Sequence, residues 1–245
     1  MVRRALPRPE AKWVSRLFPT AGEAVIVFQS TGADKRPGRG DGGSPVPAEE
    51  IAARRAVTHV RRYSAANLLS RLGTLTYAGT GCHDPVGLRG DVRGFFRALR
   101  ARVGSNFPYL WTAEWHPGGH GLHVHFAVGR YLARGAIERA WPHGFVHIKL
   151  LGDLPYGVST RGEARHVARY LSKYVAKSMD GSTPGLHRYD VAEGFAPPEE
   201  RASSRSSELA VAGVVERMGR SPDFRSDSPE WTAYAGPPAV FVSWD

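Results

Sequence analysis

Residues 121–128, Gly-Leu-His-Val-His-Phe-Ala-Val, alternate between two kinds of side chain. In an extended strand His123, His125 and Ala127 share one face, and the apolar residues between them share the other. Such a strand suits a divalent metal ion, because residues i and i+2 point the same way and both imidazoles reach one ion. The competing interpretation is that the histidines hydrogen-bond within a solvated sheet face, since His-x-His is short and common.

The charge of the chain favours a polyanionic partner. The formal net charge is +10 and the isoelectric point is about 10.1. An excess of this size is typical of nucleic-acid binding, in which phosphate neutralisation releases counterions. A plain abundance of arginine would give the same total, so the placement of the cations is more informative. Of the lysines at positions 12, 35, 149, 173 and 177, two fall in one helical segment.

Length and composition predict a cytoplasmic globular protein. The 245 residues suffice for one domain with extensions, and 42% of them are hydrophobic. No uncharged apolar run of about 18 residues is present, so we expect no membrane span. The N-terminal residues carry charge without a following apolar run, so we expect no signal peptide. Cys82 is the single cysteine, which excludes an internal disulfide and fits a reducing compartment.

Periodicity along the chain predicts an α+β fold. Residues 1–47 form a basic extension with a Gly/Pro-rich linker, residues 48–195 the main domain, and residues 196–245 an extension that is mostly irregular, with an edge strand at 239–244 and a short amphipathic segment at 208–218. The predicted helices lie at 48–72, 91–103, 132–141 and 163–178, and the predicted strands at 24–28, 73–77, 108–115, 121–128 and 145–150.

Two local details accompany this prediction. Asp91 is expected to N-cap the second helix. The apolar stripe of the first helix is expected to comprise Ile51, Ala52, Val57, Val60 and Leu68. Strand, helix, strand, strand, helix, strand, helix is an order that favours an antiparallel sheet with helices packed on it rather than a doubly wound fold.

Residues 163–178 separate into four stripes on a helical wheel. Val167, Leu171 and Val175 form the core stripe, and Ala168, Ser172 and Ala176 allow close packing. The basic stripe contains Arg165, Arg169, Lys173 and Lys177, and beside it run His166, Tyr170 and Tyr174. Aromatic residues at helical spacing usually serve packing, and cations usually face solvent. Here, however, each of the two tyrosines is followed three residues later by a lysine.

Three motifs together resemble the HUH endonucleases, and most closely the two-tyrosine rolling-circle replication initiators (Rep proteins) of plasmids and single-stranded DNA phages. They are Thr74-Leu75-Thr76-Tyr77, then His123-Val124-His125, then Tyr170-Leu171-Ser172-Lys173-Tyr174, in the family's order. The resemblance covers roughly residues 60–195. It implies a ferredoxin-like antiparallel β-sheet that carries the metal, with the tyrosine helix laid across it.

The resemblance also implies a ligand set. Such sites add a third ligand, often a carboxylate on the strand before the His-x-His strand. Glu114 is the acid of that hairpin and is assigned this role, with His120 as the competitor, which could instead line the loop or contact DNA. The ion is Mn²⁺ or Mg²⁺, which this donor set does not distinguish. The remaining histidines, 143, 147, 166 and 187, are interpreted as structural or solvent-exposed.

The implied activity is sequence-specific nicking and joining of single-stranded DNA, which initiates rolling-circle replication. A tyrosine hydroxyl attacks the phosphodiester and leaves a 5′-phosphotyrosine and a free 3′-OH. Tyr170 and Tyr174 are the nucleophiles, with Tyr174 favoured as the first, and Lys173 and Lys177 assist them. Arg165, Arg169, Lys173, Lys177 and His120 are assigned to DNA binding. The expected partners are origin DNA, a host helicase and a DNA polymerase, because no phosphate-binding Gly-x-x-x-x-Gly-Lys motif is present; no small-molecule substrate is expected.

Other functions remain open at this point. A two-tyrosine transposase or a mobilisation relaxase would share the chemistry, although a relaxase usually has its tyrosine before the histidines. A member that has lost nicking would bind origins only. A protein of another class would be a non-catalytic origin-binding module with a structural metal, but few firm ligands and no cysteine pair are available for one.

Overall fold

The computed structural model describes residues 12–30, 47–149, 160–177, 187, 189–231, 234 and 236–245. The chain divides into two compact units. The central unit is Val46–Pro197, and the flanking unit combines Met1–Pro45 with Pro198–Asp245. Within the described ranges, no helix is both long and apolar enough to cross a membrane.

The central unit is built on an antiparallel sheet with the strand order β6-β3-β5-β4-β7. Its first four strands and two helices follow the ferredoxin-like sequence β3-α2-β4-β5-α3-β6, which confirms the α+β class. The elements are α1 (Ala48–Ala66), β3 (Arg71–Tyr77), α2 (Pro85–Val103), β4 (Tyr109–Trp115), β5 (Leu122–Val128), α3 (Arg134–Ala140), β6 (Gly144–Lys149), α4 (Thr160–Lys177) and β7 (Asp190–Val191).

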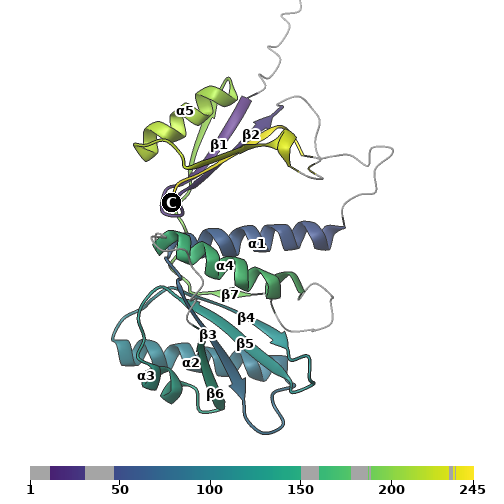
Figure 1. The fold of residues 1–245 in the computed structure, drawn as a ribbon, viewed down its shortest axis with the longest axis vertical. Coiled ribbons are helices and arrows are strands. Elements are labelled where there is room, and N and C mark those ends of the chain that lie inside the picture. The colour runs from purple at the N-terminus through teal and green to yellow at the C-terminus, as the bar shows by residue number, and fades with distance from the viewer. Residues whose placement is uncertain are drawn as a thin grey trace, which may run out of the picture. The chain divides into compact units, whose positions relative to one another are not determined.

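Helices cover both faces of this sheet (Figure 1). Helices α2 and α3 lie on one face, where the apolar residues of β5 join a core of aromatic and aliphatic side chains. Helices α1 and α4 lie on the other face and pack closely on each other. The two faces correspond to the alternation seen in residues 122–128, since Val124 and Phe126 enter the α2/α3 core while His123 and His125 face the α1/α4 side.

The second helix of the central unit begins earlier than the sequence predicted. Its N-cap is Asp84, whose carboxylate accepts hydrogen bonds from the backbone N–H groups of Val86 at 2.9 Å and Gly87 at 3.0 Å. Pro85 follows at the first helical position, where its missing N–H costs nothing. The predicted cap, Asp91, is instead inside the helix and accepts a hydrogen bond from the Tyr77 hydroxyl at 2.8 Å.

The buried stripe of α1 also differs from the predicted one. Ile51 and Leu68 are exposed, and Leu68 lies beyond the end of the helix. The buried positions are Ala53, Ala56, Val60 and Tyr63. The small alanines allow α4 to approach closely, and the Tyr63 hydroxyl donates to the carbonyl of Ala192 at 3.2 Å. Contacts with distant segments therefore select a stripe that periodicity alone did not identify.

The flanking unit is a second antiparallel sheet with the order β8-β1-β2-β10-β9. Helix α5, whose prediction as an amphipathic segment is correct, packs on one face of it (Figure 1). The predictions that the last 50 residues are mostly irregular and that the final strand is an edge strand are wrong: β10 lies between β2 and β9. The elements are β1 (Lys12–Phe18), β2 (Glu23–Gln29), β8 (Glu200–Ser204), α5 (Ser207–Met218), β9 (Phe224–Asp227), the short 3₁₀ helix η1 (Ser228–Glu230) and β10 (Ala239–Ser243).

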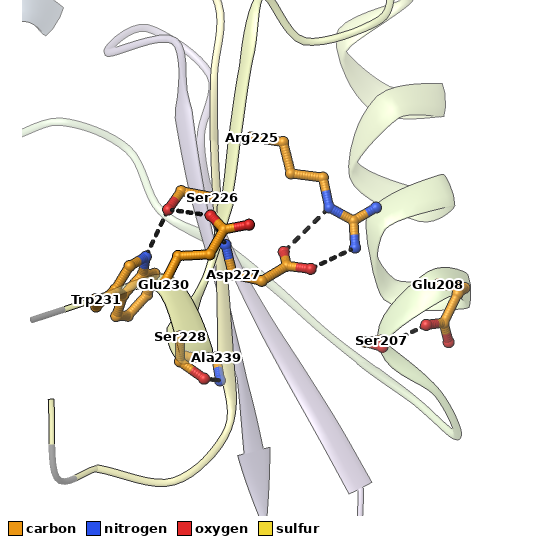
Figure 2. Close-up of polar contacts among 9 residues, drawn as sticks. All are labelled: Ser207, Glu208, Arg225, Ser226, Asp227, Ser228, Glu230, Trp231 and Ala239. Atoms are coloured by element: carbon orange, nitrogen blue, oxygen red, sulfur yellow. Dashed lines mark hydrogen bonds and ion pairs between the residues drawn. The ribbon is translucent and has the colours of Figure 1, made fainter.

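Side-chain hydrogen bonds fix the corner between β9 and β10 (Figure 2). Ser226 donates to Glu230 at 3.1 Å and accepts from the indole N–H of Trp231 at 2.7 Å. Ser228 accepts from the backbone N–H of Ala239 at 3.0 Å. These bonds give the chain a defined turn before β10 enters the sheet.

Candidate metal and tyrosine site

Two rows of side chains cross the α1/α4 face of the central sheet. In one row, His125 is paired with Thr74 on β3 and with Thr112 on β4. In the neighbouring row, His123 is paired with Glu114 on β4. Because side chains in register across antiparallel strands lie about 5 Å apart, this pairing gathers imidazole, hydroxyl and carboxylate groups on one small area.

The threonines of β3 hold the inner ring nitrogens of both histidines. Thr74 Oγ1 lies 3.0 Å from His125 Nδ1, and Thr76 Oγ1 lies 3.5 Å from His123 Nδ1. A threonine hydroxyl can donate to a bare Nδ1 or accept from a protonated one. When Nδ1–H donates to the threonine, the Nε2 lone pair is left for a metal ion, which is how outer groups orient histidine ligands.

The outer ring nitrogens of the two histidines have different surroundings. His125 Nε2 lies 3.4 Å from Glu114 Oε2. His123 Nε2 is buried and has no hydrogen-bond partner. Burial lowers the pKa of both histidines, further lowered for His123 by the nearby His116 and His120 and opposed by Glu114 for His125. Both imidazoles are therefore neutral near pH 7, which is the form that binds metals.

Helix α4 brings both tyrosines to these histidines. Its predicted core stripe is correct, since Val167, Leu171 and Val175 are fully buried. This orientation places the Tyr174 ring parallel to the His125 ring, with centroids 3.9 Å apart and planes 17° from parallel. The Tyr170 ring lies edge-on to His125 at 6.4 Å.

The two phenols are hydrogen-bonded to each other. The Tyr174 hydroxyl donates to the Tyr170 hydroxyl at 2.7 Å. Burial raises the pKa of Tyr174, and the bond to Tyr170 and the charge of Glu114 raise it further. Without added positive charge, Tyr174 is therefore a neutral phenol and a weak nucleophile at neutral pH.

The hairpin loop before β5 contributes two more imidazoles. The His116 ring stacks on the His123 ring at 4.7 Å, and its Nδ1 accepts from the backbone N–H of Gly118 at 3.1 Å. His120 Nε2 donates to the carbonyl of Tyr77 at 3.0 Å, which ties the loop to the end of β3. Gly121, with φ of +84°, lets the loop meet the backbone of Cys82, because a Cβ there would lie 2.3 Å from the Cys82 oxygen.

The basic stripe of α4 lies beside this cluster. Lys173 and Arg169 are exposed, and Lys173 Nζ is 5.8 Å from the centre of the Tyr170 ring. Arg165 is half-buried. The side chain of Lys177 lies outside the described part of the structure, although its backbone ends α4.

The donor set suits a divalent cation in its chemistry, since two neutral imidazoles and one carboxylate are ordinary ligands of such ions. The unpartnered His123 Nε2 is consistent with a ligand atom awaiting a partner. The side chains are not already arranged as a cage: in the described residues no three His, Cys, Asp or Glu groups meet in a metal-binding geometry. Ion binding at this site therefore requires side-chain rotation.

The structure gathers His123, His125, Glu114, Tyr170 and Tyr174, and places His120 at the loop. Sequence reasoning missed Thr74 and Thr76 as hydrogen-bond partners of the histidines and gave no role to His116. The first omission had a detectable signal, because Thr74 and Thr76 alternate on one face of a predicted strand. His116 had none, since ring stacking from a turn depends on the loop conformation.

The fold and the cluster define an α+β protein of the Rep type, in which a sheet carrying a His-x-His pair faces a helix carrying tyrosines. In agreement, residues 70–179, which run from the start of β3 to the end of α4, match the family of the replication-associated protein ORF2. The match covers 110 of the 245 residues and supports a replication initiator that binds DNA. No significant match was found among curated proteins or among solved structures.

Proposed function

We infer that the central unit nicks and rejoins single-stranded DNA at a replication origin by a metal-dependent reaction of the HUH type. The observation that carries this inference is the contact between His125 and Tyr174, at 3.9 Å between ring centres. A phosphodiester held at the histidines would lie directly beside a phenolic oxygen, so attack would need little further movement of the helix.

Each residue of the cluster has a role in this proposal. His123, His125 and Glu114 would hold the divalent ion, with Thr74 and Thr76 fixing the two rings. A bound ion would supply positive charge next to a non-bridging phosphate oxygen and to the attacking phenol. Lys173 and Arg169, exposed on the same helix, would bind the phosphates on either side of the reacting one.

The reaction is a transesterification at phosphorus. The tyrosine oxygen forms a bond to the phosphorus atom while the bond from phosphorus to the 3′ oxygen breaks. The phenolic proton is lost to solvent or to a neighbouring base, and the departing 3′ oxygen takes up a proton. The product is a 5′-phosphotyrosine and a free 3′-OH, and the reverse reaction joins a strand without ATP.

The bond between the two hydroxyls supports successive rather than simultaneous use of the tyrosines. A phenolate on one ring is stabilised by an O–H donated from the other, whereas two phenolates 2.7 Å apart repel each other. One tyrosine would therefore carry the DNA while the other remains protonated until a second transfer. The direction of the bond, from Tyr174 to Tyr170, favours neither as the first nucleophile once a substrate is bound.

The proposal is tested by incubating the full chain with a pool of random single-stranded oligonucleotides and Mn²⁺. We expect an SDS-resistant protein–DNA adduct, and sequencing of the attached strands identifies the origin. Chelation with EDTA should prevent the adduct. Binding without any adduct, at several divalent ions, would instead support the non-catalytic DNA-binding module.

A further inference from the structure

Phe145 is a large apolar side chain in an unexpected place. It lies on β6, a strand at the edge of the central sheet, and 69% of it is exposed to solvent. Its neighbours Val146 and Ile148 point into the α2/α3 core. Single exposed apolar residues are common on proteins, so exposure alone carries no conclusion.

The position of Phe145 in the sheet is what gives it significance. Phe145 is paired with Thr76, whose hydroxyl contacts His123. It therefore belongs to the row that continues through His123 to Glu114. Since adjacent strands lie about 4.8 Å apart, Phe145 is two strand spacings, about 10 Å, from His123 on the same face.

The surroundings of Phe145 suit a nucleobase better than an apolar protein surface. The next residue on this face of β6 is His147, which is exposed, and both are paired with threonines of β3. Helix α4 contacts β3 and β4, and its exposed cations, Arg169 and Lys173, provide charge for the phosphates of a strand crossing the sheet. An isolated ring among polar groups beside a basic helix is how single-stranded nucleic acids are commonly held.

We propose that Phe145 stacks on a base of single-stranded DNA adjacent to the phosphate held at the histidines, and so sets which phosphate reaches Tyr170 and Tyr174. The proposal rests on the proposed function for the position of the reacting phosphate. The stacking itself is a binding event, so it can be measured without cleavage.

Binding is measured on the full chain with Phe145→Ala, Phe145→Trp and the control Tyr131→Ala. Tyr131 is 71% exposed on the same unit and has its ring 5.4 Å from Arg71. The probe is an oligothymidylate carrying one 2-aminopurine, in EDTA. We expect Phe145→Ala to weaken binding about 5- to 100-fold and to abolish the quenching of 2-aminopurine, while Phe145→Trp retains both.

The dependence of affinity on salt separates stacking from charge. Phe145→Ala should leave the slope of log affinity against log salt unchanged, whereas Arg169→Ala should reduce it by about 0.7, as expected for one phosphate contact on a single strand. Wild-type affinity in Phe145→Ala, or equal losses in the Ala and Trp variants, would overturn the stacking proposal. Normal stacking together with no covalent adduct under any condition would overturn the nicking function and leave the base contact standing.

Discussion

The rings of His125 and Tyr174 are stacked, 3.9 Å apart and 17° from parallel, although 49 positions separate them in the chain. The stack joins the sheet, through β5, to the helix that carries both phenols. It also means that the phenol oxygen of Tyr174 and the ring nitrogens of His125 move together, which limits the geometries that a bound phosphate can adopt.

The tyrosines are tested by removing their hydroxyl groups. Tyr170→Phe and Tyr174→Phe should each change the yield of covalent adduct, and the double variant should form none, since no phenolic oxygen remains near His125. The rings are retained, so the stack and the fold should persist in thermal unfolding. Tyr189→Phe is the matched control, because that hydroxyl contacts His59 at 3.0 Å instead. An adduct from the double variant would show that another residue is the nucleophile.

The metal ligands are tested by replacing both histidines of the strand. His123→Ala combined with His125→Ala should remove divalent-dependent cleavage while leaving salt-sensitive DNA binding largely intact, because the basic stripe of α4 is unchanged. In the wild type, Mn²⁺ at about 100 times its Kd should raise the free energy of unfolding by about 2.7 kcal/mol. The double variant should lose this increase and His143→Ala, on the opposite face, should keep it. Equal stabilisation of all three proteins would place the ion elsewhere.

The threonines of β3 are tested through their hydroxyl groups. Thr74→Val keeps the shape of the side chain but removes the partner of His125 Nδ1, so metal affinity should fall about 10- to 100-fold, as for other residues that orient histidine ligands. Thr74→Ser keeps the hydroxyl and should remain close to the wild type. Isothermal titration with Mn²⁺ measures both, and identical affinities for Val and Ser would mean that the hydroxyl does not orient the ring.

The flanking unit should lose stability in acid. Arg16 donates two hydrogen bonds to Glu199, at 2.7 and 2.8 Å, and lowers the pKa of that carboxyl to about 2 from its ordinary 4.5. A carboxyl whose pKa is lowered by folding adds stability above its unfolded pKa, and this contribution disappears as the pH falls from 4.5 toward 2. Urea unfolding followed by tryptophan fluorescence should show the loss between about pH 5 and 2.

The matched variants for this pH effect are Glu199→Gln and Glu216→Gln. The first removes the ionisable partner of Arg16, so its unfolding free energy should be lower at neutral pH and depend less on pH in the acid range. Glu216 is exposed on α5 and has no ion pair within the described part of the chain, so its replacement should follow the wild type. Indistinguishable pH profiles for the two variants would contradict the assignment to Glu199.

The elements that the sequence predicted well carry strong local patterns. Strand β5 was recognisable because polar and apolar residues alternate along it, and α4 because Val167, Leu171 and Val175 repeat at helical spacing. The start of α2 was missed although Asp84-Pro85 is a good local signal, because the apolar stripe begins later and directed attention to Asp91. Strand β1 was missed because its exposed Arg16 and Lys12 interrupt the apolar pattern at the rim of a sheet.

The arrangement of the candidate site depended on information that no local pattern contains. Pairing of Thr74 with His125 requires the register between β3 and β5, which are 51 residues apart at this contact. The resemblance of the motifs placed histidines and tyrosines in one site, but the phenol–phenol bond and the isolated Phe145 follow from backbone geometry. Such relationships arise when distant segments pack, and periodicity cannot foresee them.

The sheet of the flanking unit takes β1 and β2 from one end of the chain and β8, β9 and β10 from the other. During translation, the early hairpin therefore leaves the ribosome with both of its borders unpaired and stays so until the last strand has been made. The central unit can fold in that interval. A nascent or prematurely stopped chain would thus carry an adhesive β-ribbon, and a chaperone that shields it would determine how much intact protein accumulates.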